Sequence, residues 1–363
     1  MVQYWGFSYG TILGATLSAM YPDRIQRAIL DGVADSHDYM AGSWTTNLAD
    51  TDLEFIKLAE YCWLAGPSKC LIYDEDGPAV IIDTLAAILA NFTTNPIGVP
   101  GTSTSGPDVV TYDDLKRVFR TIVYNPLGDF TRTVRILAGI RDRNGTALAA
   151  YKRASLPDLK RPLSEACLKA GPYSAECNID THGGESTYGI ACSDALPRLN
   201  QTKDSYREYA SKIQAQSRLL GEDWATIQLP CTAWHARPEW RYEGNFTAKT
   251  AHPILFVGNT IDPVTPLRNA FLMSAGFEGS GVLQQDGEGH CTWSGVSLCS
   301  GRAVRQYFQS GELPKPKKGD KVEVCKVDRL PLDGYSDLEA HEVEVPEGEE
   351  DVELWRALVG FNK

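Results

Sequence analysis

The sequence lacks an excess of basic residues. Its 363 residues include 35 Lys and Arg against 47 Asp and Glu, which gives a formal net charge of -12 at pH 7. Proteins that bind nucleic acid neutralise phosphates with clustered Lys and Arg, so we expect no nucleic-acid partner. Hydrophobic residues make up 43% of the chain and charged residues 23%, as is usual for a globular protein with a sizeable core.

Long hydrophobic runs are also missing. No stretch reaches the roughly 20 apolar residues that a membrane-spanning helix requires, so we expect no membrane association. Residues 1–15 do not combine a basic segment with a following apolar segment, and this pattern excludes a secretory signal within them.

The nine cysteines form no C-x-x-C pair, which disfavours zinc and thioredoxin-type sites; we expect no metal and no cofactor. Four N-x-S/T sequons accompany them, at Asn91, Asn144, Asn200 and Asn245. This combination favours an oxidising, secretory route, hence a secreted glycoprotein. Sequence alone does not fix the connectivity; the pairs we favour are Cys62–Cys70, Cys167–Cys177, Cys192–Cys231 and Cys299–Cys325, which leaves Cys291 as a buried free thiol.

A chemical motif stands at the start of the chain. Residues 6–10 read G-F-S-Y-G and match G-x-S-x-G, the turn that presents a nucleophilic serine in α/β-hydrolases. A strand pattern precedes this turn, a helix pattern follows at Thr11–Met20, and a second strand pattern follows at Ile25–Val33. This is the βαβ unit of a parallel sheet. The motif therefore predicts Ser8 as nucleophile and the Tyr9 amide as an oxyanion donor.

The rest of the chain divides by pattern. Residues 36–245 show mainly helical periodicity, whereas short apolar strand patterns return at 253–258 and 281–285. We expect an α/β-hydrolase fold with a mostly helical cap inserted in the sheet domain. The expected parts are 1–35 (core with the nucleophile turn), 36–245 (cap), 246–314 (core with the acid and histidine loops) and 315–363 (extended acidic tail). The expected helices are Leu48–Leu64, Ala79–Phe92, Tyr112–Val123, Ser205–Leu220, Val296–Phe308 and a short one near Leu354–Val359.

A serine nucleophile needs a base and an orienting acid, which follow it in chain order as acid and then histidine. His290 lies in a loop directly after the last expected strand, and Asp262 follows the strand before it. Asp286 is the alternative acid, although it is close to His290 in sequence. We expect structural or solvated roles for the remaining histidines, which are His37, His182, His235, His252 and His341.

Three long segments carry a resemblance. GFSYGTILGATLSAMYPDRIQRAILDGVAD, HPILFVGNTIDPVTP and EGHCTWSGVSLCSGRAVRQYFQSGELP resemble the tripeptidyl-aminopeptidase-like α/β-hydrolases, relatives of proline iminopeptidase. The resemblance spans residues 2 to about 325 and is looser in the middle. It implies Ser8, Asp262 and His290 as the catalytic triad, and hydrolysis of peptides at a free amino terminus beneath a helical cap.

The chain departs from that family at its beginning. Family members carry several strands and a second oxyanion donor before the nucleophile turn, so we expect the amino-terminal part of the fold to be missing. Three functions stay open: a serine exopeptidase, an esterase or lactonase acting on a secondary metabolite, and a truncated inactive fragment. The substrate would be a peptide or a small ester or amide. Trp5, Tyr9 and Trp293 flank the expected triad and are candidate substrate-binding residues.

Overall fold

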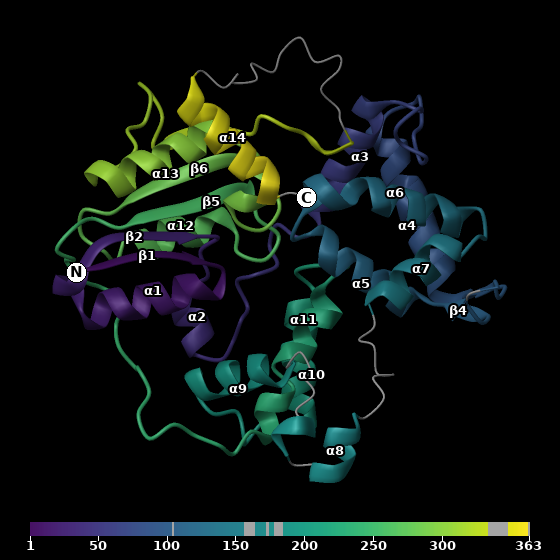
Figure 1. The fold of residues 1–363 in the computed structure, drawn as a ribbon, viewed down its shortest axis with the longest axis horizontal. Coiled ribbons are helices and arrows are strands. Elements are labelled where there is room, and N and C mark those ends of the chain that lie inside the picture. The colour runs from purple at the N-terminus through teal and green to yellow at the C-terminus, as the bar shows by residue number, and fades with distance from the viewer. Residues whose placement is uncertain (104, 156–163, 172–173, 178–183, 333–347, 362–363) are drawn as a thin grey trace.

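A five-stranded sheet forms the centre of the fold. The computed structural model describes residues 1–103, 105–155, 164–171, 174–177, 184–332 and 348–361. All neighbouring strands in this sheet are parallel, and their order is β1-β2-β5-β6-β7. Segments from both ends of the chain therefore build one sheet (Figure 1). The strands are β1 (Val2–Phe7), β2 (Ile25–Asp31), β5 (Leu255–Ile261), β6 (Gly281–Glu288) and β7 (Glu323–Lys326).

Helices cover both faces of this sheet, because successive residues of a strand point to opposite sides. Ala28 and Leu30 of β2 belong to an apolar cluster with α1 and α12, whereas Ile29 between them packs against α13. Central strands buried on both faces read as continuous apolar runs, which is why the pattern at 253–258 predicted a strand. The helices around the sheet are α1 (Tyr9–Met20), α12 (Leu267–Ser274), α13 (Leu298–Ser310) and α14 (Glu349–Phe361).

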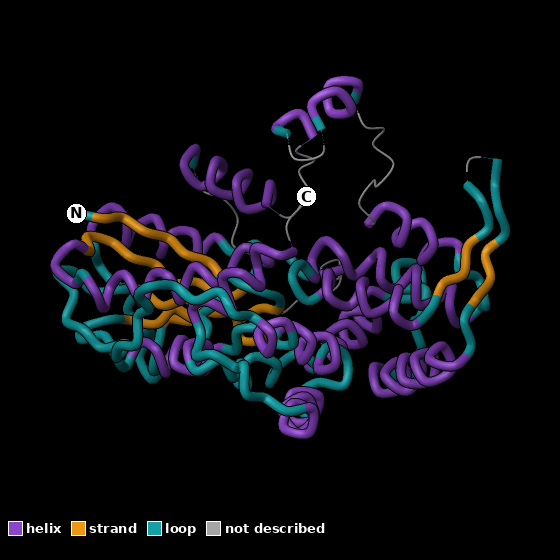
Figure 2. Tube along the Cα trace, turned by 90° about the horizontal axis from the view of Figure 1, so that it is seen from below, coloured by secondary structure: helices purple, strands orange, loops and turns teal. Residues whose placement is uncertain are grey.

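The helical part, residues 36–245, lies beside the carboxyl ends of the strands. Figure 2 shows the sheet gathered at one end of the molecule and the small β3–β4 hairpin at the other. The elements are α2 (Ser36–Met40), α3 (Leu53–Ala65), α4 (Pro78–Thr94), β3 (Ile97–Val99), β4 (Asp108–Val110), α5 (Tyr112–Ile122), α6 (Pro126–Arg141), α7 (Thr146–Ser155), α8 (Glu165–Ala170), α9 (Gly184–Asp194), α10 (Lys203–Gln214) and α11 (Gly221–Ile227).

Three expected elements differ in extent. The helix expected at Leu48–Leu64 starts only at Leu53. The helix expected at Ser205–Leu220 ends at Gln214, and α11 starts only at Gly221. The chain folds back on itself there, because a Cβ atom at Gly221 would lie 2.6 Å from Gln214 Cα. The tail after residue 314 is not extended throughout: it adds β7 to the sheet and the 13-residue helix α14.

Four disulfides are present, and they join the pairs favoured from the sequence: Cys62–Cys70, Cys167–Cys177, Cys192–Cys231 and Cys299–Cys325. Cys291 is a buried free thiol. Among the described helices, none combines the length and the apolar character needed to cross a bilayer.

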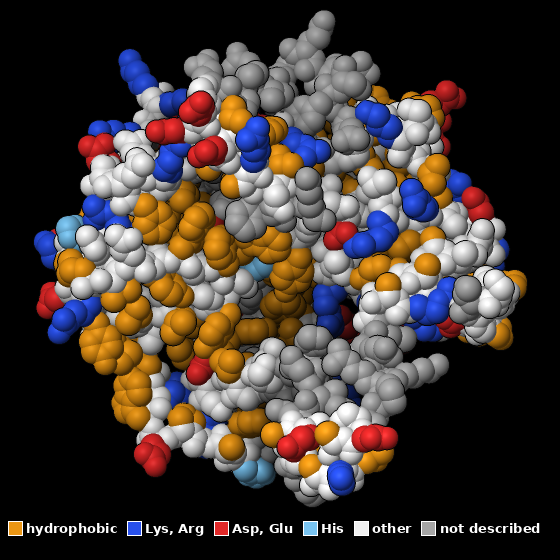
Figure 3. Space-filling view, in the orientation of Figure 1, with side chains coloured by type: hydrophobic (Ala, Val, Ile, Leu, Met, Phe, Trp, Pro, Cys, Tyr) orange, Lys and Arg blue, Asp and Glu red, His pale blue; other side chains and the backbone are white. Residues whose placement is uncertain are grey.

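The molecular surface is hollowed between the sheet and the helical part (Figure 3). Hydrophobic side chains line this hollow, and others gather over the side where β1 and α1 lie. Trp5 and Phe7 of β1 are 42% and 37% exposed. The hollow lies at the carboxyl edge of a parallel sheet, which is where such sheets bind their ligands.

Candidate active site

Ser8 occupies a strained turn between β1 and α1. It has φ 55° and ψ -119°, and its N–H donates to the Asp31 carbonyl at 3.0 Å. A positive φ is costly for a residue other than glycine, and such residues cluster at functional sites. Gly6 permits the sharp turn, because a Cβ atom there would lie 2.5 Å from the Gly10 carbonyl oxygen. The turn lifts the half-buried Ser8 side chain to the carboxyl edge of the sheet.

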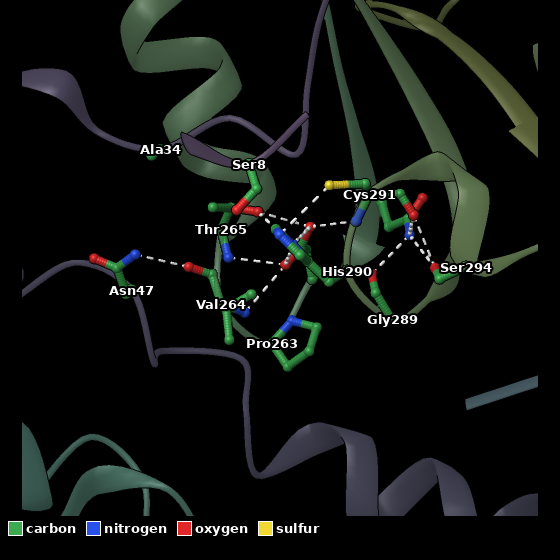
Figure 4. A network of polar contacts seen from close by, with 12 residues as sticks. Ser8, Ala34, Asn47, Pro263, Val264, Thr265, Gly289, His290, Cys291 and Ser294 are labelled. Carbon is green, nitrogen blue, oxygen red and sulfur yellow. Dashed lines mark hydrogen bonds and ion pairs between the residues drawn. The ribbon is translucent and has the colours of Figure 1, made fainter. Parts of the chain in front are cut away.

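Asp262 and His290 meet at the same edge. Asp262 directly follows β5, is fully buried, and has both carboxyl oxygens 3.1 Å from His290 Nδ1. Thr265 Oγ1 also lies 3.0 Å from Nδ1. This arrangement leaves Nε2 as the ring nitrogen that can accept a proton. Figure 4 shows the Ser8 and His290 side chains directed at the same small region.

The environment favours the ionised form of Asp262. Burial alone would raise its pKa, but the charge and hydrogen bond of His290, the Cys291 N–H and the Thr265 hydroxyl outweigh burial and hold the pKa below its ordinary value. The two residues after Pro263 contribute further: Val264 N–H and Thr265 N–H donate to Asp262 Oδ1 at 3.0 and 2.8 Å. The carboxylate can therefore orient His290 and stabilise it when it is protonated.

Backbone contacts fix the loop that carries His290. Asn259 Nδ2 donates to the carbonyls of Gly289 and Cys291 at 2.7 and 2.8 Å. His290 N–H donates to the Val123 carbonyl at 3.1 Å, and the Tyr124 ring packs edge-on against the imidazole with centroids 5.1 Å apart. The histidine loop is thus held by the sheet on one side and by the helical part on the other.

Asp31, at the end of β2, was not predicted as part of the site. It is fully buried and accepts hydrogen bonds from the Thr292 N–H at 2.9 Å and from the Thr292 hydroxyl. Burial raises its pKa to about 6, against the opposing effect of the Thr292 hydrogen bonds. The Asp31-Gly32 dipeptide in the sequence marked the strand end but gave no sign of this contact with the histidine loop.

Cys291 lies within the site as a neutral thiol. Its Sγ is 3.5 Å from His290 Nε2 and 3.5 Å from the Asp31 carbonyl oxygen. Burial raises the pKa of this thiol well above its ordinary value, so it does not supply a thiolate ligand. Asp262, His290 and Cys291 place potential ligand atoms within 4.8 Å of one another. Because the Asp262 oxygens already accept several hydrogen bonds, this donor set fits a triad better than a metal.

The alternatives considered for the acid and base lie elsewhere. Asp286 is exposed and accepts a hydrogen bond from the Thr260 hydroxyl at 2.8 Å. His37 stacks edge-on with Phe246 at 5.0 Å. His235 is exposed and His252 is half-buried. His182 and His341 lie outside the described residues.

A cavity of about 270 Å³ opens beside Ser8. Its wall is largely aromatic and comes from both parts of the molecule: Tyr9 belongs to the sheet part, and the helical part supplies Tyr39, Trp44, Tyr124 and Trp224. Asp194 of α9 accepts hydrogen bonds from both the Tyr9 and Tyr39 hydroxyls, at 2.8 and 3.1 Å. The rings of Trp44 and Trp224 stack with centroids 5.3 Å apart. The space next to the nucleophile therefore suits an apolar group.

A second cavity of about 270 Å³ shares Tyr124, Thr187 and Trp224 with the first. Arg120 and Asp223 also line it, and their side chains pair at 2.9 Å. The two cavities are therefore neighbours, and the second one contains charged groups of the helical part.

Tyr9 lies where the sequence predicted, but Trp5 and Trp293 do not line the cavity beside Ser8. Both line a separate apolar cavity of about 650 Å³ between β1, α13 and α14. The reason is strand alternation: the Trp5 side chain faces α13 and packs against Phe308, with ring centroids 6.0 Å apart. The residues missed as cavity lining, among them Trp44 and Trp224, come from the helical part, far from the motif in sequence.

Comparison with known proteins agrees with this geometry. Residues 217–322 match the family model described as TAP-like protein. The chain is also similar to the tripeptidyl aminopeptidases of Streptomyces lividans and of Streptomyces coelicolor, each 24% identical over 315 residues. The matched region covers 85% of this chain and 52% of each relative, so the chain spans about half the length of the curated relatives it matches. The parallel sheet, the inserted helices and these matches support a TAP-like α/β-hydrolase.

Proposed function

We propose that the protein is a secreted serine peptidase that removes residues from the amino terminus of peptides through an acyl-enzyme on Ser8. The observation that carries this proposal is the convergence of Ser8, His290 and buried Asp262 at the carboxyl edge of the sheet. The name of the similar Streptomyces proteins supports the choice of a peptide substrate. Four disulfides and four exposed sequon asparagines support a secreted protein.

Each group has a defined role in the proposed reaction. His290 Nε2 takes the proton of Ser8 Oγ as the oxygen attacks the carbonyl carbon, and it later returns this proton to the leaving amine. Asp262 holds the imidazole through Nδ1. The Tyr9 N–H, as the first amide of α1, has no partner within the helix and is free to donate to the oxyanion. Water then hydrolyses the acyl-enzyme by the same proton transfers in reverse.

The cavity beside Ser8 suggests how a peptide would bind. This aromatic cavity would hold the residue whose carbonyl is attacked together with the amino-terminal end of the substrate. An exopeptidase must recognise the terminal ammonium group with a carboxylate. Asp35 lines the first cavity and uses only its Oδ1 to cap α2, whereas Asp223 of the second cavity is already paired with Arg120. We therefore propose the other carboxyl oxygen of Asp35 for this contact.

The first test is intact mass after treatment with an alkyl fluorophosphonate, a reagent that phosphonylates activated serines. We expect one adduct in the wild-type chain and none in Ser8→Ala. Absence of an adduct from a folded wild-type chain would refute the proposed mechanism and leave a binding protein with the fold of a hydrolase.

Substrate class is decided by a matched panel of free-amino peptides, their N-acetylated forms and simple esters. A free amino group should raise kcat/KM. Preference for the esters, with no effect of acetylation, would favour the esterase or lactonase alternative, which the apolar cavity beside Ser8 also suits.

A further inference from the structure

The loop that carries Asp262 makes hydrogen bonds to the helical part in addition to those within the loop itself. Two side chains of the helical part donate to backbone carbonyls of this loop. Thr51 Oγ1 donates to the Pro263 carbonyl at 2.6 Å, and Asn47 Nδ2 donates to the Val264 carbonyl at 2.8 Å. Figure 4 shows the second contact, with the Asn47 amide directed at Val264. Both donors are buried, at 0% and 7% exposure, so water does not compete for these carbonyls.

These contacts act on the same peptide groups that bind the acid. The Pro263 carbonyl and the Val264 N–H are opposite ends of one planar peptide group, and the Val264 carbonyl and the Thr265 N–H are opposite ends of the next. Both N–H groups donate to Asp262 Oδ1. Because each peptide group is rigid, fixing its carbonyl also fixes the direction of its N–H.

We propose that Thr51 and Asn47 are positioning residues for the triad, each aiming one backbone N–H at Asp262 through an intervening peptide group. The inference rests on the proposed role of Asp262 as triad acid. Hydrogen bonds in series also polarise one another, so each donor strengthens the bond that the acid receives. Asn47 further lines the cavity beside Ser8, and it thereby links the substrate space to the acid loop.

Helix α3, which directly follows the segment with Asn47 and Thr51, supports the histidine loop. Tyr61 of α3 donates to Glu288 Oε1 at 2.7 Å, two residues before His290. Glu54 of the same helix is fully buried. Burial and the nearby carboxylates raise its pKa well above the ordinary value. Glu54 and Tyr61 lie two helical turns apart and so share one face of α3, and this face contacts the histidine loop through Tyr61.

The decisive comparison is Thr51→Val against Thr133→Val. Valine keeps the shape of threonine and removes the hydroxyl. Thr133 of α6 is an equally buried threonine of the helical part, but its hydroxyl has no partner among the described residues. Thr51→Ser keeps the hydroxyl and serves as the rescue variant. We expect Thr51→Val to lower kcat by roughly 10-fold or more with KM changed less than about twofold, because misplaced catalytic groups cost rate. Thr51→Ser and Thr133→Val should stay close to wild type.

A second readout does not depend on turnover. The proton between His290 Nδ1 and Asp262 should give a far-downfield proton NMR resonance, and we expect Thr51→Val, but not Thr133→Val, to shift or broaden it. If wild type lacks activity, this resonance still tests the positioning role, so failure of the proposed function and failure of this inference are distinguishable.

Unchanged kcat and an unchanged resonance in Thr51→Val would overturn the inference. If thermal unfolding shows that Thr51→Val does not fold, Asn47→Ala decides by the same two readouts. A wild-type kcat and resonance in that variant would equally overturn the inference.

Discussion

The sheet part (residues 1–35 and 246–332) and the helical part (36–245) contribute to the site in different ways. In the sheet part the backbone brings the groups of the proposed triad together: Ser8, Asp262 and His290 each follow a strand, and parallel strands end at one edge. In the helical part, side chains reach the site from irregular segments and helix faces, as Thr51 and Trp224 do. The geometry of the proposed triad is thus set by strand order, whereas the neighbouring cavity and the support of the loops depend on long-range side-chain contacts.

The sharpest way to test the contribution of the sheet part is Asp262→Asn. The amide keeps the shape but removes the charge and favours the wrong histidine tautomer, so we expect kcat to fall by about 10⁴-fold. The measurement is steady-state kinetics on the best substrate of the panel. Asp286→Asn is the matched control. Asp286 was the alternative acid from the sequence, but its exposed carboxylate accepts a hydrogen bond from Thr260 instead of contacting His290. An equal fall in kcat in both variants would contradict the assignment of Asp262 as the acid.

Disulfide removal compares the stability of the two parts. Cys192–Cys231 closes 39 residues in the helical part, and Cys299–Cys325 closes 26 residues in the sheet part. The chain-entropy relation gives a loss of about 4 kcal/mol for the first pair and about 3.5 kcal/mol for the second when both cysteines become alanine. Urea unfolding followed by circular dichroism measures these losses. A single cooperative transition in every variant would show that the two parts unfold together, whereas an early partial transition confined to the first variant would separate them.

A smaller effect concerns Asp31, which supports the histidine loop from within the sheet. Its pKa of about 6 in the folded protein lies above the ordinary value of 3.8 for an aspartate. The folded state therefore binds a proton more tightly than the unfolded state between about pH 4 and 6, and stability falls as the pH rises through this range. The loss approaches about 3 kcal/mol above pH 6. Asp31→Asn should flatten this dependence, measured as unfolding free energy against pH; an unchanged slope would contradict the assignment.

The sequence predicted most of the sheet part because its signals are local. The G-F-S-Y-G turn, the apolar runs and the positions of Asp262 and His290 directly after strands each identify one element without knowledge of the others. Even His290, one histidine among six, was distinguished by its place after a strand. These inferences require only that parallel strands present their carboxyl ends together.

The supporting contacts could not be predicted in this way. Asn47 and Thr51 lie in an irregular segment before α3, and their partners are 217 and 212 residues away. Nothing in an Asn or a Thr of such a segment specifies a distant carbonyl. Trp5 and Trp293 were predicted to lie beside the proposed triad because they are close to its residues in sequence. In the structure both line another cavity. Proximity along the chain does not decide which face of a sheet a side chain reaches.

The two doubly held peptide groups at 263–265 have a consequence for protein engineering. They belong to the acid loop by covalent connection and to the helical part by hydrogen bonding, so the cap cannot be exchanged as a separable module. A graft that imports another cap to change substrate preference must also import an equivalent of Asn47 and Thr51. Without these two donors, the carbonyls of Pro263 and Val264 would lose the contacts that direct the neighbouring N–H groups at Asp262.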